Sequence, residues 1–235
     1  MQNQILYHKT QEFLATRSTL PKIIVIYGPT ASGKTALSVE LAKKLGTEII
    51  SADSRQIYRY MNIGTGKVTE EEKQGVPHHM LDIIDPTEKF SVVDFVNMSL
   101  PIIERIQTQG KIPIICGGTG LYIDGLLYEM SYPETKPDWE YRSELERIRL
   151  EQGNETLWKM LADIEPAYAH ELGVNNFRYI MRALEVWRAT GKSKSESKGK
   201  KTPRFSPLFL TPYKDTCRPV LYERINHRVE SMFNA

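Results

Sequence analysis

Short apolar runs alternate with helical patterns along the first half of the chain. Residues 22–27 (KIIVIY), 47–51 (TEIIS) and 112–116 (IPIIC) are short and rich in β-branched residues, which predicts three buried strands. Residues 35–45 carry leucines at every fourth position and the pattern stops at Gly46, which predicts a helix after the first strand. Strands that alternate with helices form parallel sheets, and ligands bind at the carboxyl ends of such strands. The sequence therefore predicts an α/β fold in which the loops after these strands meet at one crevice.

A helix-start signal precedes the third of these strands. Ser91 stands three residues before Asp94, which is the spacing of a capping box, and Phe90 and Phe95 are spaced as its hydrophobic staple. Pro101 is expected to bend the helix that follows, because proline lacks a backbone N–H. This helix would connect the second strand to the third.

From about Leu126 onward, helical patterns follow one another without strands between them. Each segment is bounded by Gly or Pro, as expected where helices start and stop. The segments are residues 138–153, 156–166 and 175–191. They predict a helical insertion.

The stretch at residues 192–207 is rich in Lys and Ser and has too little apolar surface to fold by itself. After it, residues 207–213 (PLFLTPY) predict a strand that returns to the sheet, and residues 220–233 predict a helix at its edge. The expected organisation is an N-terminal extension at 1–20, a catalytic core at 21–125 and 206–235, and a helical insertion at 126–205 with a flexible basic segment.

The distribution of charge changes this picture more than the overall composition does. The 235 residues are 40% hydrophobic and 26% charged, with a net charge of +2, which is ordinary for a globular chain. Residues 176–205, however, hold nine basic and two acidic side chains, a net charge of +7 that leaves −5 for the rest. A contact with a polyanion and a solvated charged surface both explain this asymmetry.

Several function classes are disfavoured by what the sequence lacks. It contains no apolar run of the roughly 20 residues that a membrane helix needs, and residues 1–20 are too polar for a secretory signal, so a cytoplasmic location is expected. Cys116 and Cys217 lack the spacing of a disulfide scaffold or a zinc site and are expected to be core thiols. The pair His78 and His79 has no third ligand at metal-binding spacing.

Residues 28–35 (GPTASGKT) match the pattern of a phosphate-binding loop and lie between a predicted strand and a predicted helix. In such a loop, backbone N–H groups and the helix N-terminus face the phosphate, Lys34 adds a positive charge and Thr35 can ligate Mg²⁺. The predicted phosphate-binding residues are Gly28, Pro29, Thr30, Ala31, Ser32, Gly33, Lys34 and Thr35. The fold expected is thus a P-loop NTPase-like parallel sheet flanked by helices, although kinases, switches and transferases all use such loops.

Three other features carry candidate chemistry, each with a structural alternative. Asp53 follows the second predicted strand, where it can accept a proton or hold a metal, or serve as a turn residue. Residues 117–120 (GGTG) allow the backbone to approach a ligand and Thr119 offers a hydroxyl, or they form a simple tight turn. Arg224 lies on the last predicted helix, where an exposed surface arginine is the alternative.

Seven motifs follow one another over roughly residues 22–234: GPTASGKT, DSRQIYRYMNIGTGK, VPHHMLDIIDP, FSVVDF, CGGTGLYIDGLL, NNFRYIMRALE and LYERI. Together and in this order they resemble the tRNA dimethylallyltransferase family, also called tRNA isopentenyltransferases. The resemblance implies transfer of a dimethylallyl group from dimethylallyl diphosphate to N6 of adenosine 37 of tRNA, with Mg²⁺ as cofactor. It also implies that the helical insertion and its basic segment hold the anticodon stem-loop.

The resemblance further assigns roles to single residues. Asp53 would be the general base that orients the adenine amine, and Lys34 and Arg224 would neutralise the departing diphosphate. Thr30 and Thr119 would line the channel between the two substrates. The implied tRNA contacts are Asp53, Ser54, Arg55, Gln56, Thr119, Arg142, Arg178, Tyr179, Ile180, Met181 and Arg182. This scheme is chemically sound because an exocyclic amine is a poor nucleophile and the diphosphate gains charge as it leaves.

Three alternatives stay open at this level. An enzyme that prenylates free adenine nucleotides would share the phosphate loop, Asp53 and the GGTG stretch, but would have less use for a basic helical insertion. A P-loop small-molecule kinase would transfer a phosphoryl group from ATP. A nucleotide-gated RNA-binding module would leave Asp53 without a role. A monomer is the default expectation in each case.

Overall fold

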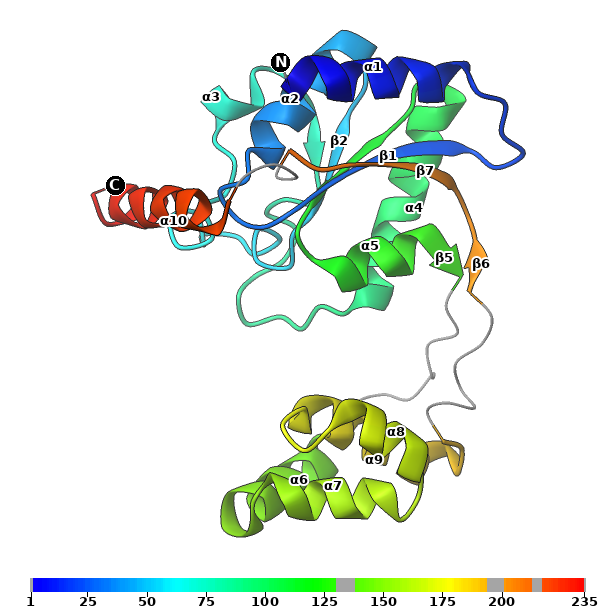
Figure 1. Ribbon diagram of the computed structural model, residues 1–235, viewed down its shortest axis with the longest axis vertical. Coiled ribbons are helices and arrows are strands. Elements are labelled where there is room, and N and C mark those ends of the chain that lie inside the picture. Colours follow the sequence, from blue (N-terminus) through cyan, green and yellow to red (C-terminus); the bar gives the residue numbers. More distant parts are fainter. Residues whose placement is uncertain (1, 130–137, 194–200, 213–216, 235) are drawn as a thin grey trace. The chain divides into compact units, whose positions relative to one another are not determined.

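The computed structural model describes residues 2–129, 138–193, 201–212 and 217–234. The chain divides into two compact units, an α/β unit (Met1–Glu129 with Thr202–Ala235) and a helical unit (Met130–Lys201) (Figure 1). Of the lysines in the predicted flexible segment, Lys194, Lys198 and Lys200 lie outside the described residues.

A parallel sheet forms the centre of the α/β unit. In the described part of the chain its strands follow the order β3-β2-β4-β1-β7, and every pairing is parallel. Their bounds are β1 Lys22–Tyr27, β2 Ile49–Ala52, β3 His78–His79, β4 Ile114–Gly117 and β7 Ser206–Leu210. The three strands predicted in the first half of the chain are confirmed with small shifts at their ends, and the returning strand pairs with β1 at the sheet edge.

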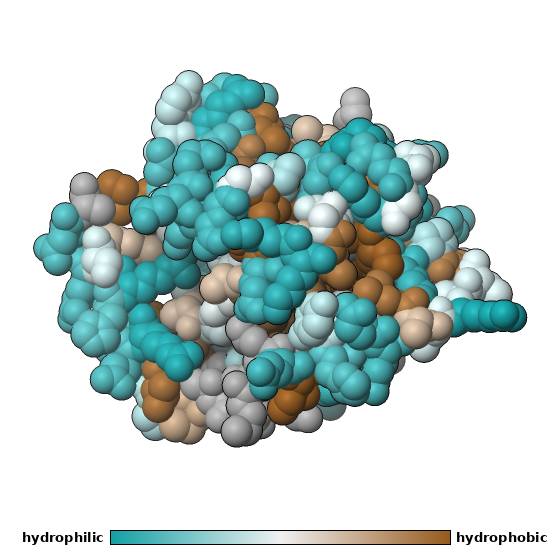
Figure 2. Space-filling view, turned by 90° about the horizontal axis from the view of Figure 1, so that it is seen from above, coloured by the Kyte–Doolittle hydropathy of each residue, from teal (hydrophilic) through white to brown (hydrophobic). Residues whose placement is uncertain are grey.

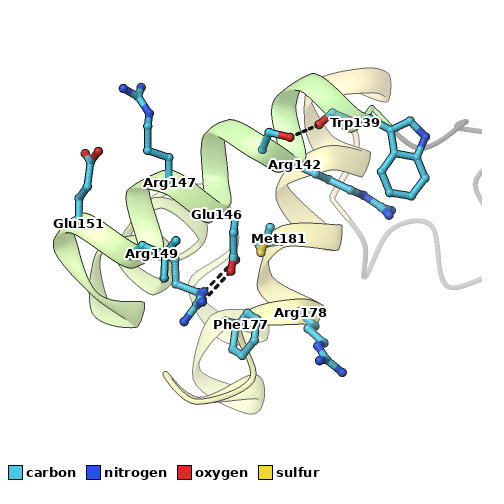
Figure 3. Close-up of a pocket in the computed structure, with 11 residues that line it drawn as sticks. Trp139, Arg142, Glu146, Arg147, Arg149, Glu151, Phe177, Arg178 and Met181 are labelled. Carbon is cyan, nitrogen blue, oxygen red and sulfur yellow. Dashed lines mark hydrogen bonds and ion pairs between the residues drawn. The ribbon is translucent and has the colours of Figure 1, made fainter.

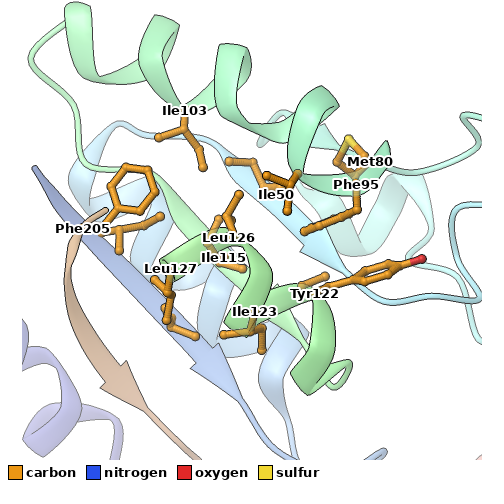
Figure 4. Packing of buried hydrophobic residues seen from close by; sticks show 14 of the residues in the cluster. Ile50, Met80, Phe95, Ile103, Ile115, Tyr122, Ile123, Leu126, Leu127 and Phe205 are labelled. Carbon is orange, nitrogen blue, oxygen red and sulfur yellow. The ribbon is translucent and has the colours of Figure 1, made fainter. Parts of the chain in front are cut away.

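The helices of the α/β unit are α1 Gln2–Ala15, α2 Lys34–Leu45, α3 Glu70–Lys73, α4 Val92–Thr108, α5 Gly120–Leu127 and α10 Arg218–Phe233. Four of them, α1, α2, α4 and α5, cover the two faces of the sheet. On one face, α4 and α5 pack against the strands around Phe95, which stacks on Tyr122 with ring centroids 4.3 Å apart (Figure 4). On the other face, α2 and α1 bury Leu37, Leu41 and Leu6. This packing positions the short connection between β4 and α5, which contains Thr119 as the N-cap residue of α5.

Local signals at the ends of the helices are confirmed. Ser91 and Asp94 form a capping box, in which the Asp94 N–H donates to Ser91 Oγ (3.3 Å) and the Ser91 N–H to Asp94 Oδ2 (2.8 Å). Gly46 ends α2 in the left-handed conformation that glycine favours. Helix α4 continues past Pro101 to Thr108.

Residues 1–20 belong to the α/β unit rather than standing apart from it. Leu6 and Thr10 of α1 are buried. Lys22 Nζ donates to the carbonyl oxygens of Phe13 and Leu14, both at 2.8 Å, and so satisfies acceptors at the end of the helix. Buried side chains therefore pack helix α1 against the sheet, and the ammonium group of Lys22, on β1, binds the carbonyl oxygens at its C-terminal end.

The structure refines one sequence expectation in this unit and contradicts another. Thr202–Pro203 form β6, which pairs with β5 (Tyr128–Glu129) in an antiparallel ribbon, so the end of the polar stretch at 192–207 is ordered by a partner strand rather than by itself. The backbone of β6 pairs with β5, which lies far from it in the sequence, so no local pattern predicts this pairing. Cys217 is exposed rather than a core thiol, because it precedes α10 as its N-cap residue, whereas Cys116 on β4 is partly buried.

Four helices make up the described part of the helical unit: α6 Trp139–Gln152, α7 Asn154–Ala162, α8 Pro166–Leu172 and α9 Phe177–Thr190. They surround a core that includes Leu145, Leu157 and Leu184. The sequence predicted only three of them, since it treated Pro166 as a stop. Proline is also favoured in the first turn of a helix, where its missing N–H has no intrahelical partner, and there it starts α8.

Candidate active site

The phosphate-binding loop connects β1 to α2. Gly33 adopts a left-handed conformation (φ +87°) directly before the helix, as a turn of this kind requires. Lys34 Nζ donates to the carbonyl oxygen of Pro29 across the loop, at 2.6 Å. Ser32 Oγ is buried and, within the described residues, lacks a hydrogen-bond partner. The loop thus presents a cation and an unpaired hydroxyl at the N-terminus of a helix, where anions are stabilised.

Asp53 lies in the loop after β2 and is held by its own turn. Its Oδ1 accepts from the N–H groups of Arg55 (2.8 Å) and Gln56 (3.4 Å). Within the described residues Oδ2 has no such partner. The turn interpretation of this residue is confirmed, and the turn fixes the carboxylate so that its second oxygen is left for a ligand.

Thr119 connects the loops after β2 and β4. Its Oγ1 accepts from the Ser54 N–H at 3.0 Å, and its own N–H donates to the Ala52 carbonyl oxygen at 3.1 Å. A β-carbon at Gly117 would collide with that Ala52 carbonyl group, so the approach of the two strands requires glycine there. The GGTG stretch hence fixes the loop that carries Asp53.

One cavity joins these loops at the sheet, as the strand pattern predicted. Five of the predicted site residues line it: Thr30, Lys34, Thr35, Asp53 and Gln56. Ser38, Thr65, Cys116 and Arg228 also line it and were missed by sequence reasoning. Arg228 follows Arg224 by one helical turn, and this spacing was the only sequence signal for it.

Arg224 does not line the cavity. Its side chain is exposed on α10, while Arg228, on the same helix, reaches the cavity and is partly buried. The arginine of α10 that lines the cavity with Lys34 is thus Arg228, whereas the family resemblance implied Arg224.

The electrostatics of the cavity are set by burial and by neighbouring charges. Burial lowers the pKa of Lys34. The nearby Cys116 and Asp53 side chains act in the opposite direction and raise this pKa, whereas the positive charge of Arg228 lowers it further. Burial likewise raises the pKa of the Cys116 thiol. A lysine that is desolvated beside an arginine gains stability when an anion binds between the two.

The two adjacent histidines point to different environments. The His78 ring lines the cavity and its Nδ1 donates to the Val76 carbonyl oxygen at 2.8 Å, whereas His79 Nε2 lies 2.6 Å from Glu48 Oε2. Among the described residues, His, Cys, Asp and Glu side chains form no group of three that could hold a metal ion.

The helical unit carries an open groove of about 790 Å³ between α6 and α9 (Figure 3). Arginines and aromatic rings alternate along it: Arg142 lies over Trp139, with its guanidinium carbon 4.9 Å from the ring centroid, and Arg149 lies over Phe177 at 4.5 Å. Arg149 also pairs with Glu146 at 2.6 Å. Such a surface combines positive charge with stacking platforms.

The predicted tRNA contacts in this unit fall into different environments. Arg142, Arg178 and Met181 line the groove, and Tyr179 is 60% exposed. Ile180 is fully buried in the core of the unit, because α9 turns this face inward, so its side chain does not reach solvent.

Arg182 and Arg142 both bind Glu185, a carboxylate only 1% exposed. Arg142 donates from Nε (2.9 Å) and Nη2 (2.8 Å), and Arg182 donates from Nη1 (2.5 Å). Hydrogen bonds from these arginines outweigh burial and lower the pKa of Glu185, although burial is the largest single influence and acts in the opposite direction. Arg142 therefore ties α6 to α9, whereas the pair between Arg182 and Glu185 lies within α9.

The outer surface seen in Figure 2 is mostly hydrophilic, with apolar side chains in patches between polar ones. No helix in the described ranges is long and apolar enough to cross a membrane.

Comparison with known proteins covers nearly the whole chain. The family described as isopentenyl transferase matches residues 21–87, and the family described as IPP transferase matches residues 56–235. The tRNA dimethylallyltransferase of Acetivibrio thermocellus is 45% identical over 216 residues, which is 91% of this chain and 68% of the relative. That of Bacillus cytotoxicus is 46% identical over 213 residues, or 90% of this chain and 67% of the relative.

Solved structures agree with these matches. The full-length tRNA isopentenylpyrophosphate transferase of Bacillus halodurans has a TM-score of 0.59 and 42% identity, covering 91% of this chain and 66% of that one. A eukaryotic dimethylallyltransferase acting on tRNA has a TM-score of 0.75 and 32% identity, covering 91% of this chain and 53% of that one. The chain spans about two thirds of the length of its bacterial relatives. By sequence and by fold, it belongs to the IPP transferase family.

Proposed function

We propose that this protein transfers a dimethylallyl group from dimethylallyl diphosphate to N6 of adenosine 37 in the anticodon loop of tRNA, releasing diphosphate. The observation that carries the proposal is the shared cavity, in which the cation of a phosphate loop and the Asp53 carboxylate face one space in a chain of this family. A tRNA substrate implies a cytoplasmic enzyme, and one chain supplies both the donor and the acceptor residues.

The donor side consists of the phosphate loop and the start of α2. Lys34 and the loop N–H groups bind the diphosphate and stabilise the negative charge that develops as its C–O bond breaks. The unpaired Ser32 Oγ is a further donor that a phosphate oxygen would satisfy. Thr30 borders the cavity beside them.

A magnesium ion fits the same place. Thr35 lines the cavity next to Lys34, and Mg²⁺ is usually bound by few protein oxygens together with substrate phosphates. Such an ion would be held by Thr35 and the diphosphate, and it would neutralise charge on the leaving group.

The acceptor side is built on the Asp53 turn. Asp53 Oδ2 accepts a hydrogen bond from the exocyclic amine and takes its proton as the new C–N bond forms and the C–O bond to diphosphate breaks. The Arg55 and Gln56 amides keep Oδ1 in place meanwhile. Thr119 and Ser54 hold the neighbouring loop, so that the base enters a preorganised site.

The groove of the helical unit is proposed to contact the anticodon stem-loop. Arg178 and Arg142 supply charge for phosphates, and Trp139 supplies an exposed ring for an unpaired base. Ile180 would act indirectly, by packing α9 against the core of the unit, and Arg182 would do so by pairing with Glu185 on the same helix.

The decisive experiment incubates the protein with an unmodified anticodon stem-loop and either dimethylallyl diphosphate or ATP, then measures the masses of the digested nucleosides. We expect one dimethylallyl group on adenosine from the first donor only. An otherwise identical stem-loop with guanosine at position 37 is the control and should remain unmodified. Prenylation of AMP in a parallel incubation that replaces the stem-loop by AMP would favour the free-nucleotide alternative, and phosphoryl transfer from ATP would favour a kinase.

A further inference from the structure

Three large apolar side chains follow one another within a single loop of the α/β unit, and all three are exposed. Tyr60 is 81% exposed, Ile63 51% and Met61 41%. Within the described residues, the Tyr60 ring has no aromatic, cationic or hydrogen-bonding partner. Exposed apolar side chains that gather in one place mark a binding surface, whereas single ones are ordinary. Residues 60–63 are called the apolar loop below.

The backbone of Tyr60 is held in an uncommon conformation. Its φ is +64°, in the left-handed region, where the β-carbon of most residues crowds the backbone. Glycine fits such a position at lower cost, so the local backbone does not explain a tyrosine here. Packing does not explain it either, because the ring is exposed. The side chain is thus needed neither by the turn nor by the core.

Hydrogen bonds hold the chain on both sides of Tyr60. Lys67, whose side chain is only 6% exposed, donates from Nζ to the Tyr58 carbonyl oxygen at 2.7 Å and to Asn62 Oδ1 at 3.0 Å. The same ammonium group pairs with Asp82. The apolar loop is therefore preorganised, which lowers the entropy that a partner must remove on binding.

The apolar loop borders the cavity of the candidate active site. Thr65 lines the cavity, and its Oγ1 donates to the Met61 carbonyl oxygen. Gln56 also lines it, and its Nε2 donates to the Gly66 carbonyl oxygen at 3.1 Å. Arg228 Nη2, from α10, donates to the same oxygen at 2.8 Å. The exposed side chains of the loop are thus connected directly to residues of the cavity wall.

An RNA with an unpaired base fits this surface. The proposed reaction requires adenosine 37 to leave its stack and enter the cavity that contains Asp53, which uncovers the face of a neighbouring base. Aromatic side chains bind such uncovered base faces. Arg55 is exposed and, in the described part of the chain, has no carboxylate at ion-pair distance, so it offers a cation for the adjoining phosphates.

We propose that the Tyr60 ring stacks on a base next to adenosine 37 and replaces the neighbour that this base loses when the adenosine enters the cavity. Met61 and Ile63 extend the apolar surface around the ring. A free nucleotide has no neighbouring base, so Tyr60 favours an acceptor within an RNA loop over a free one. The inference rests on the proposed function, which supplies the RNA.

The first test measures binding of the unmodified stem-loop to the wild type, Tyr60→Gly and Tyr60→Phe. Glycine suits the left-handed backbone, so Tyr60→Gly should fold with a Tm equal to or above that of the wild type. Its affinity for the stem-loop should fall about 5–150-fold, the range for the loss of one stacked base. Tyr60→Phe keeps the ring and should stay within about twofold of the wild type.

Gln74→Gly is the matched control for the backbone. Gln74 is exposed, has a φ of +49° at the end of α3 and does not line the cavity. This variant makes the same change of conformational freedom without removing a ring, and it should bind the stem-loop as the wild type does. An equal loss of affinity in Gln74→Gly and Tyr60→Gly would overturn the proposal.

Altered RNAs then separate stacking from a structural role. Two stem-loops each carry an abasic site at one neighbour of adenosine 37, position 36 or position 38. On one of them the wild type and Tyr60→Gly should bind within about twofold of each other, because the ring has no base left to contact. The same ratio of affinities on both altered RNAs and on the intact stem-loop would overturn the proposal. Unchanged affinity of Tyr60→Gly for the intact stem-loop would also overturn it and would leave the apolar loop to a protein partner.

Transfer assays distinguish this inference from the proposed function. For Tyr60→Gly, kcat/KM for the stem-loop should fall while the KM for dimethylallyl diphosphate stays within about twofold of the wild type. If the wild type prenylates no stem-loop, the proposed function fails. If the wild type prenylates it and Tyr60→Gly does so equally well, only the role of Tyr60 fails.

Discussion

Lys34 and Arg228 in the α/β unit and Arg142 and Arg182 in the helical unit are two pairs of cations with opposite surroundings. Within the described residues, the first pair lines a cavity with no carboxylate at ion-pair distance. The second pair binds one buried carboxylate, that of Glu185. A desolvated cation without a counterion suits an anionic ligand, whereas breaking a buried ion pair destabilises the fold. The role of a basic residue thus depends on its partner rather than on local charge density.

The largest effect is expected at the carboxylate that shares the cavity with the first pair. Asp53→Asn keeps an oxygen for the Arg55 and Gln56 amides but removes the base. We expect prenyl transfer to slow by about 10²–10⁴-fold, the usual loss for a general base. Binding of donor and stem-loop should change little, which equilibrium titrations would check. Near-normal turnover would remove Asp53 from the proton transfer.

A large loss of stability is expected on removing the carboxylate of the second pair. Glu185→Ala leaves two partly buried arginines without a counterion and should lower the free energy of unfolding by about 3–5 kcal/mol. Glu146→Ala is the matched control, because the carboxylate of its pair with Arg149 is exposed, so its loss should change the free energy of unfolding little.

The same variant distinguishes the two units. Glu185→Ala should weaken binding of the stem-loop but leave inorganic diphosphate binding intact, since the cavity lies in the α/β unit. Calorimetric titrations with each ligand measure both properties. Loss of diphosphate binding would contradict the separation of roles.

A third ion pair provides a smaller effect that depends on pH. Hydrogen bonds from Arg105, and secondarily from His79, lower the pKa of Glu48 from 4.5 to about 2 despite its burial. Because this pKa is depressed in the folded state, its contribution to stability is full above pH 4.5 and is lost as the pH falls toward 2. Urea unfolding between pH 7 and 3 should therefore show a steeper decline for the wild type than for Glu48→Gln. Parallel curves would show that the pair is not coupled to folding.

The smallest effect is expected at the exposed cations of the groove. Arg178→Gln should reduce the slope of log affinity against log salt for stem-loop binding by about 0.7–0.9, the value of one phosphate contact. Lys9→Gln, an exposed charge on α1, should leave the slope unchanged. Equal slopes in all three proteins would identify Arg178 as a solvated surface residue.

Much of the fold could be predicted because its signals are local. The phosphate loop, the start of α4 at Ser91 and the end of α2 at Gly46 each depend on residues within one or two turns. Other elements were missed where the local signal was ambiguous: Pro166 was interpreted as the end of a helix, although it starts α8. The pairing of β5 with β6 joins residues from the two ends of the helical insertion, which no local pattern reveals.

By itself the sequence determined strands β1, β2, β4 and β7, helices α2, α4 and α10, the phosphate loop and the position of Asp53 after β2, because strand, loop and helix propensities act over a few residues. Only the tertiary structure decided which cations line the cavity. Arg228 and Gly66 are 162 residues apart, and Arg142 and Glu185 are 43 residues apart. Electrostatic roles follow from distance and desolvation in space, and these quantities exist only once the sheet and the helices have packed.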